Sequence, residues 1–369
     1  MKSESQLPVI QALCGARRKL QRHSDQLLLD ALAVLSGAKP AFLLDYAQVA
    51  AEDLEPLAVD LQRATGVDCA LLSWGTSCHL VANVRALICH LQREGLWGGQ
   101  PGGVSLEAGG ATTRREMDDE ATIAPPVMMI GFDPRVQAEE NRARSDVSDV
   151  CASPRILKKS RSLAIRRGLT PLLSALCDWI AEGGRVSSMA AEAARSEMRP
   201  TQQPQNIGSG SASAVLRLDL ERLPGLPLMP TLNGVLLGYP VVYAVSSEDE
   251  STRAAVCLSS DSITVFRACV EASDWDRLLT AMRQQTTDGK EATGGNSGKR
   301  KQGDLCISAF SVPTLLLSRD LEGGVAPSDR VSNCVEVWAT GLRSALQCRT
   351  GLTGVVCSRE DKGLQAISL

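Results

Sequence analysis

Two aspartates stand at the ends of predicted strands, where a sheet can present them to a ligand. Asp45 closes the apolar run Ala41–Asp45, and Asp133 follows the run Val127–Phe132. Open α/β sheets bind ligands beyond the carboxyl ends of their strands, and carboxylates there can hold Mg²⁺ for hydrolysis or phosphoryl transfer. A structural interpretation competes with this one, because Asp133 precedes a proline as a helix cap would and Asp45 can begin a loop. No phosphate-binding glycine loop follows either strand. A divalent-metal-dependent hydrolase or phosphotransferase is therefore the alternative hypothesis, not the leading one.

Two Cys-His pairs could supply metal ligands. Cys78-His79 and Cys89-His90, together with Cys69, place five potential zinc ligands in a short span. Structural zinc sites use ligand pairs about two to four residues apart on tight turns, whereas adjacent side chains on a helix or strand point in different directions. No orienting partner or oxyanion turn marks these pairs as a nucleophile and its base. Core thiols and a helix-surface histidine explain them better, and no particular cofactor is indicated.

A basic stretch lies between Arg155 and Arg167. It contains no acidic residue, so it could contact phosphates or serve as a nuclear-import signal. It also contains no aromatic side chain that could stack on bases. We therefore predict a solvated basic linker that leads into a helix beginning at Thr170, and nucleic-acid binding is not expected.

The composition limits the classes of partner. A formal net charge of −3, from 39 basic and 42 acidic residues, creates no field that would draw the chain to nucleic acid or anionic lipid. The longest apolar run, Thr231–Val245, is shorter than the roughly 20 residues of a spanning helix, and it contains glycines and a proline. No membrane span is expected.

Cysteine use and the N-terminus indicate the compartment. Twelve cysteines are scattered through apolar runs of a chain that is too long to need disulfides. The basic residues near the N-terminus follow the short apolar stretch, which is the reverse of a secretory signal. We expect reduced thiols and a cytoplasmic or nuclear location.

Helices and strands are predicted to alternate along the chain. A helix that Gly66 ends connects the strand Ala41–Asp45 to the strand Val67–Ser73, a βαβ unit whose strands are expected to be parallel. Caps and apolar periodicity predict further helices at Ser24–Gly37, Asn83–Gly95, Thr170–Gly183, Thr231–Gly238, Ser273–Met282 and Val335–Leu346. Apolar runs predict further strands at Ala214–Leu220, Pro240–Val245, Ala254–Leu258, Ile263–Val270, Leu305–Val312, Leu352–Ser358 and Leu364–Ser368.

Two strand pairs are predicted to be antiparallel. Ala254–Leu258 and Ile263–Val270 are separated by Ser-Ser-Asp-Ser, which suits a hairpin turn, and the last two strands flank the turn Arg359–Gly363. The sequence thus predicts one α/β domain over residues 20–369, with a mixed, partly parallel sheet packed by helices.

Three stretches are too poor in large apolar residues to fold. They are 98–124, 184–211 and 284–303, which are rich in Gly, Ser, Gln, Thr and charge. Such segments cannot bury enough surface to offset the entropy lost on ordering. We expect three flexible insertions in the single domain, and a flexible N-terminal segment 1–19.

Several segments carry a resemblance to a known family. They are Ala41–Val49 (AFLLDYAQV), Asn83–Gln92, Ser262–Val270 and above all Thr231–Tyr243 (TLNGVLLGYPVVY). In these segments the chain resembles a family of uncharacterised eukaryotic proteins typified by the chromosome 1 open reading frame 74 product. The resemblance covers about half of the chain, in its N-terminal third and its centre. It implies no activity, ligand or site residue.

The leading functional hypothesis is a non-catalytic protein that acts through protein–protein contacts. It is favoured because no catalytic constellation stands out, not because a docking motif is present. A structure with Asp45 and Asp133 together in a concave pocket would favour the enzyme hypothesis. Separated carboxylates and an exposed apolar patch would favour the interaction hypothesis.

Overall fold

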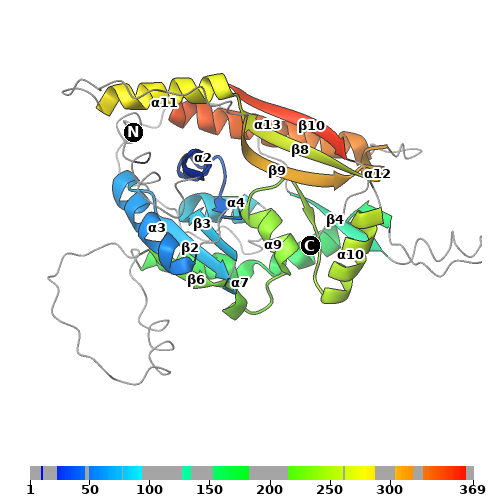
Figure 1. Cartoon of the computed structure of the whole chain (residues 1–369). Helices are drawn as coiled ribbons and strands as arrows, with labels where there is room; N and C mark the ends of the chain where they lie inside the picture. The colour runs from blue at the N-terminus through cyan, green and yellow to red at the C-terminus, as the bar shows by residue number, and fades with distance from the viewer. Residues whose placement is uncertain are drawn as a thin grey trace, which may run out of the picture.

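Helices and mixed sheets make up the described part of the chain, as the sequence predicts (Figure 1). The computed structural model describes residues 10, 23–45, 50–76, 78–93, 127–133, 153–182, 215–260, 262–286, 304–318 and 327–362. The predicted insertions 98–124 and 184–211 lie outside these residues. Of the third, 284–303, the first three residues are described and complete a helix. Of the N-terminal segment 1–19, only Ile10 is described, and its side chain is buried.

The strands of the described residues form three sheets rather than one. The first has the order β1-β3-β2-β6. Its strands are β1 (Ala41–Leu43), β2 (Cys69–Trp74), β3 (Cys78–Asn83) and β6 (Leu216–Asp219), and a short 3-10 helix, η3 (Leu220–Arg222), follows β6. β1 and β2 run in the same direction, as the predicted βαβ unit requires, but β3 lies between them and pairs antiparallel with both. The sequence pattern does not reveal β3, because almost all of its residues are buried and they show no apolar–polar alternation.

Helices cover both faces of this first sheet. They are α2 (Ser24–Leu35) and α3 (Ala51–Thr65) on one face, and α4 (Val84–Arg93), α7 (Thr170–Ala181) and α9 (Met229–Leu236) on the other. Successive strand residues point to opposite faces, so Leu71 packs with the first group and Leu72 with the second. The predicted cap of α4 is confirmed, because Asn83 Oδ1 accepts a hydrogen bond from the Ala86 N–H at 3.1 Å.

The second sheet is antiparallel, with the order β10-β8-β9. Its elements are β8 (Ile263–Val270), β9 (Leu305–Pro313) and β10 (Val355–Lys362), with helices α11 (Ala272–Thr286) and α13 (Pro327–Thr350). The prediction of a turn at Arg359–Gly363 is wrong, because β10 continues through Lys362 in register with β8. Its polar residues resemble a turn, yet Asp361 accepts a hydrogen bond from the Thr264 hydroxyl at 2.6 Å across the strands. The predicted strand Leu364–Ser368 lies outside the described residues.

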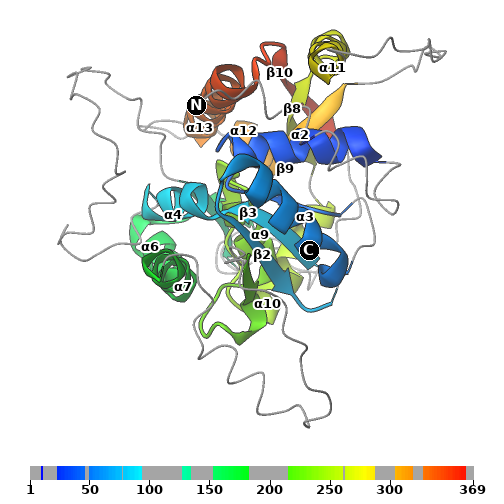
Figure 2. The same cartoon turned by 90° about the vertical axis from the view of Figure 1, so that its left-hand side faces the viewer.

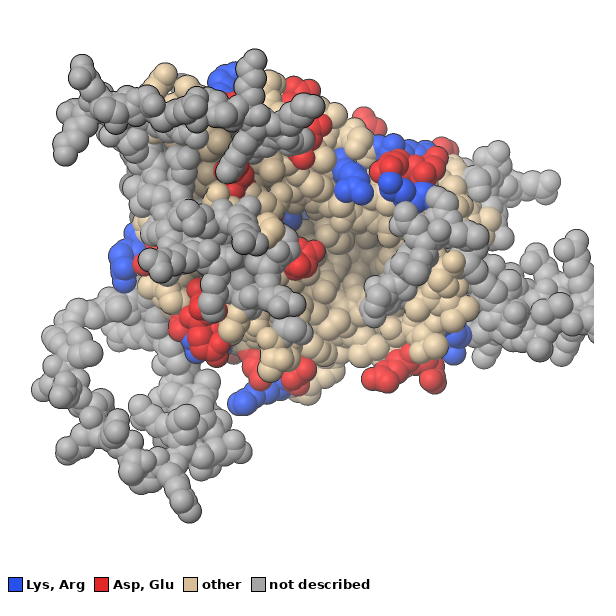
Figure 3. Space-filling model, in the orientation of Figure 1, with Lys and Arg blue, Asp and Glu red and all other residues tan. Residues whose placement is uncertain are grey.

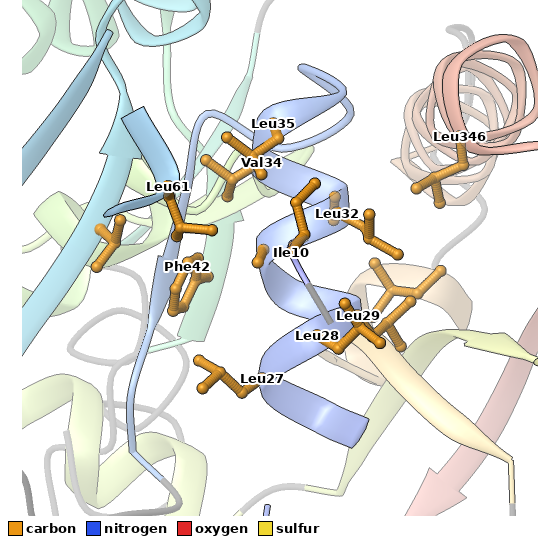
Figure 4. Close-up of a cluster of buried hydrophobic side chains, with 14 of the residues drawn as sticks. Ile10, Leu27, Leu28, Leu29, Leu32, Val34, Leu35, Phe42, Leu61 and Leu346 are labelled. Carbon is orange, nitrogen blue, oxygen red and sulfur yellow. The ribbon is translucent and has the colours of Figure 1, made fainter. Parts of the chain in front are cut away.

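Helix α2 fills the space between the first two sheets. It is apolar on almost all sides, and Leu27, Leu29 and Leu32 are at most 2% exposed. Figure 4 shows α2 side chains facing Phe42 of β1 and Leu61 of α3 on one side, and Leu346 of α13 on the other. A helix that is apolar all round belongs in a core. Both views place α11 and α13 at one end of the molecule, and α7 and α10 at the other (Figure 1, Figure 2).

The third sheet has the order β5-β4-β7, and next to it a predicted strand proves to be a helix. Its elements are β4 (Met128–Asp133), β5 (Ser153–Ile156) and β7 (Val241–Tyr243), with helices α6 (Lys159–Arg167), α10 (Glu248–Ser260) and α12 (Leu315–Ser318). The predicted strand Ala254–Leu258 lies within α10 instead. Ser247 Oγ caps this helix by accepting from the Glu250 N–H at 3.3 Å, and the Glu250 carboxylate in turn accepts from the Ser246 N–H at 2.8 Å.

The basic stretch 155–167 is also structured differently from the prediction. It forms the end of β5 and helix α6, not a solvated linker. Arg161 pairs with Glu250 of α10, and Arg166 donates to the Val127 carbonyl at 2.7 Å. These two basic side chains therefore connect elements of the fold.

Asp274 joins α11 to the loop that precedes β10. We predict that Asp274→Asn lowers the free energy of unfolding by about 2 kcal/mol at pH 7. Its Oδ2 accepts from the N–H groups of Thr353 and Gly354 at 2.8 and 2.6 Å. Burial raises the pKa of this carboxyl, but those bonds and the Arg277 charge together lower it below its usual range.

The lowered pKa of Asp274 determines how its contribution to the free energy of unfolding depends on pH. A carboxyl whose pKa is lower in the folded state stabilises the protein above its unfolded pKa, about 3.9, and the stabilisation is lost as the pH falls through the folded value. Urea midpoints of the wild type and Asp274→Asn should therefore differ at pH 7 and converge as the pH is lowered below the unfolded pKa of about 3.9 and through the lower folded pKa. A constant difference across this range would contradict the assignment.

Candidate functional site

A pocket of about 380 Å³ opens between α9, β7 and β9. Figure 3 shows the corresponding face hollowed between these elements, with mostly uncharged side chains around the hollow. The walls include Met229, Pro230, Val241, Ala309 and Phe310. A concave, mainly apolar site of this size with a few polar groups is typical of small-molecule sites.

Tyr239 reaches this pocket because of the turn that precedes it. The backbone of Gly238 is left-handed, with a φ of 72°, so α9 ends there and the chain turns into β7. The Tyr239 ring packs on Phe310 with 5.7 Å between ring centroids. Its hydroxyl makes no hydrogen bond to another described residue. Burial, followed by the Asp45 charge, raises the pKa of this phenol, so it stays protonated and can donate.

Asn233 supplies an acceptor to the same pocket. It lies one helical turn after Met229 on α9, so both side chains face the pocket. Its Oδ1 is shielded from solvent and has no partner among the described residues. Its side chain is hydrogen-bonded to the Cys78 thiol of β3, which leaves the amide oxygen unsatisfied.

Of the candidates found in the sequence, Asp45 and Cys78 lie near this pocket. Cys78 is half-buried at the start of β3 and contacts Asn233 through its thiol. Burial raises the pKa of this thiol, the Asn233 bond opposes the rise, and the Asp45 charge adds to it. Asp45 is exposed beyond the end of β1. The structure thus places a protonated thiol against Asn233, and a carboxylate close enough to Tyr239 and Cys78 for its charge to affect both.

Residues 192–278 match the model of a domain of unknown function (DUF4504). That range contains α9, Tyr239 and β7, which form one side of the pocket, as well as β8. No curated protein and no solved structure matches the chain. Among the described residues, no helix is both long and apolar enough to cross a bilayer.

Behind the pocket, Lys39 is a buried cation that sequence reasoning missed. Its Nζ donates to the Ile307 carbonyl at 2.8 Å and lies 3.9 Å from Asp30 Oδ1. Ile307 is the extra residue of a bulge in β9, where the pairing with β8 shifts. Burial lowers the pKa of Lys39, and the negative charges of Asp30 and Asp45 act against that shift.

The structure does not bring Asp45 and Asp133 to one sheet edge. Asp45 follows β1 of the first sheet, whereas Asp133 ends β4 of the third. A shared metal site at strand ends requires both carboxylates at the same edge. The metal-dependent hydrolase therefore stays a prediction that this arrangement does not favour.

The remaining Cys-His candidates are dispersed. His79 is buried on β3, with Nδ1 3.1 Å from Ser73 Oγ and Nε2 3.2 Å from the Thr76 carbonyl oxygen, so both ring nitrogens are occupied. Cys69 is buried, and burial raises the pKa of its thiol to about 12. Cys89 is exposed on α4, next to His90, which lines a different pocket. No group of three or more His, Cys, Asp or Glu side chains within the described ranges is placed to hold a metal ion.

Proposed function

We propose that the protein binds a small organic molecule in the pocket between α9, β7 and β9. The observation that carries this proposal is that Asn233 lines the pocket and that its Oδ1, shielded from solvent, has no partner among the described residues. A buried acceptor without a partner costs about 1–3 kcal/mol, and a ligand with a hydrogen-bond donor would relieve that cost. The Tyr239 hydroxyl, which also has no described partner, offers a second polar contact.

The chemistry of the wall limits the ligand class. Asp45 near Tyr239 and Cys78 disfavours an anion, and the aromatic rings of Tyr239 and Phe310 favour a flat or aliphatic body. The expected ligand is neutral or cationic, carries an amide, amine or hydroxyl donor, and has roughly the size of one ring system.

The protonation states of Cys78 and Tyr239 support ligand binding without catalysis. The raised pKa values of Cys78 and Tyr239 keep the thiol and the phenol protonated at neutral pH. A nucleophile needs a lowered pKa or an adjacent base. These groups are therefore suited to hydrogen bonding and not to covalent catalysis.

A fragment screen by thermal shift and protein-observed NMR on the full chain tests the proposal. Fragments that combine a ring with an N–H or O–H donor should raise the melting temperature, because they bind only the folded state. Asn233→Leu should weaken donor fragments about tenfold. Ala309→Leu, which fills the pocket, should abolish binding, whereas Ala281→Leu on the exposed face of α11 should leave it unchanged. Binding that survives Ala309→Leu, or no binding at all, would refute the proposal.

The interaction hypothesis is the second candidate. It needs an exposed apolar surface, but the exposed large apolar residues within the described ranges are Val256 on α10 and Val356 on β10, which lie on different elements. We therefore rank protein–protein contact below ligand binding. None of the ten cysteines that the structure describes is in a disulfide, which supports a reducing cytoplasmic or nuclear location as a proposal.

We also infer kinship with the family typified by the chromosome 1 open reading frame 74 product. The strongest resemblance, Thr231–Tyr243, lies inside the segment that matches DUF4504. This segment builds the α9 and β7 walls of the pocket.

A further inference from the structure

A second pocket of about 280 Å³ lies between α4 and α13, beside the Gly238 turn. His90 and Arg93 of α4 face Trp338 and Gly341 of α13 across it. Among the described residues that line this pocket, Arg93 is the charged one, and none is Asp or Glu. The walls otherwise consist mainly of small and apolar side chains, so the site combines an apolar body with one cation.

His90 presents a free acceptor to this second pocket. Its ring is hydrogen-bonded to the Val235 carbonyl of α9. Its Nε2 is shielded from solvent and has no partner in the described part of the chain. Burial, followed by the Arg93 charge, lowers the pKa of His90 to about 4, although the Val235 bond opposes this. The imidazole is therefore neutral near pH 7, so one of its ring nitrogens carries a lone pair, and the unpartnered Nε2 can accept a hydrogen bond in the tautomer protonated at Nδ1.

Gly341 keeps the mouth of this pocket open. It lies inside the 24-residue helix α13 and is exposed. Glycine in a helix interior makes the helix less stable than alanine would. A Cβ at this position would meet no atom within 4 Å, so packing does not require glycine here. A large side chain at this position would instead obstruct the pocket.

We propose that the second pocket binds a small organic acid that also carries a hydroxyl or amine group. The carboxylate would pair with Arg93, the hydroxyl or amine would donate to His90 Nε2, and the hydrocarbon part would lie against Trp338. Arg93 has no ion-pair partner among the described residues, and its Nε donates only to the Cys89 carbonyl, so guanidinium N–H groups remain for a carboxylate. The observations that carry this proposal are an imidazole nitrogen and a cation on one pocket wall that have, respectively, no hydrogen-bond partner and no ion-pair partner among the described residues.

Four simple probes separate the two contacts. 3-Hydroxybenzoate and 4-hydroxybenzoate carry both groups, benzoate carries only the carboxylate, and phenol carries only the hydroxyl. In NMR titrations of the full-length protein with labelled histidine, at least one hydroxybenzoate should shift the His90 Nε2 resonance upfield, as expected when that nitrogen accepts a hydrogen bond. It should bind at least tenfold more tightly than benzoate or phenol. No shift of this resonance at millimolar concentrations of either hydroxybenzoate would overturn the proposal.

Variants assign the binding to this pocket. Gly341→Leu should reduce hydroxybenzoate affinity at least tenfold, and Ser332→Leu, at an exposed position on the opposite face of the same helix, should not. Arg93→Gln should abolish the advantage of hydroxybenzoate over phenol, and His90→Phe its advantage over benzoate. Ala309→Leu, which fills the first pocket, should leave binding unchanged. Binding that persists in Gly341→Leu, or that is lost in Ala309→Leu, would refute the assignment.

Discussion

Replacing Lys39 with methionine should lower the free energy of unfolding by about 3–5 kcal/mol. The Lys39 side chain is 7% exposed, its ammonium donates to the Ile307 carbonyl, and the nearby Asp30 side chain is 6% exposed. Methionine preserves much of the apolar stem but removes the charge and the donor. Asp30 then keeps its Gln26 hydrogen bond at 3.1 Å but loses the buried Lys39 charge that lies 3.9 Å away. Urea unfolding at pH 7 measures the loss.

A double-mutant cycle distinguishes this electrostatic effect from lost packing. Asp30→Leu combined with Lys39→Met removes both charges, and it should recover about half of the loss or more, because a buried pair can be replaced by apolar residues at little net cost. Additive effects of the two single substitutions would show that Lys39 acts mainly through its stem. A loss below about 1 kcal/mol for Lys39→Met would show that the ammonium is not buried in solution.

Local signals predicted the helices better than they predicted the sheets. Asn83 caps α4 and Gly66 ends α3, because capping depends on residues within one turn of the helix end. In α10, Ala254, Cys257 and Leu258 are buried at helical spacing, yet the same short apolar run also fits a strand. The Ser247 cap resolves that ambiguity, and it precedes the run by seven residues. Strand partners depend on contacts that no local pattern records.

Only some residues of the candidate site could be predicted from the sequence. Asp45 and Cys78 stand out individually as chemically capable residues, but the position of Cys78 beside Asn233 depends on the packing of α9 against the first sheet. Asn233 is visible only as a polar residue within an apolar run. Lys39, between Gly37 and Pro40, resembles a surface turn residue, because its acceptor on Ile307 is 268 residues away in the sequence.

Gly238→Val should destabilise the protein by about 3 kcal/mol. The left-handed backbone, with a φ of 72°, disfavours a β-branched residue by about 1–2 kcal/mol. A Cβ at this position would also lie 2.8 Å from Pro40 Cδ, and crowding of a packed site adds about 1–3 kcal/mol. Pro40 cannot move away easily, because its carbonyl accepts a hydrogen bond from the Asn83 N–H at 3.0 Å.

Gly66→Val is the matched control for this prediction. Gly66 also ends a helix, with a φ of 70°, but a Cβ there would meet nothing within 4 Å. Gly66→Val should therefore lower the free energy of unfolding only by the backbone contribution of about 1–2 kcal/mol. The difference between the two urea midpoints measures the crowding against Pro40. Equal losses would mean that Pro40 yields without cost, and no loss at Gly238 would mean that the turn between α9 and β7 is not held as the structure places it. In that last case Tyr239, which follows the turn directly, would have no fixed position in the first pocket.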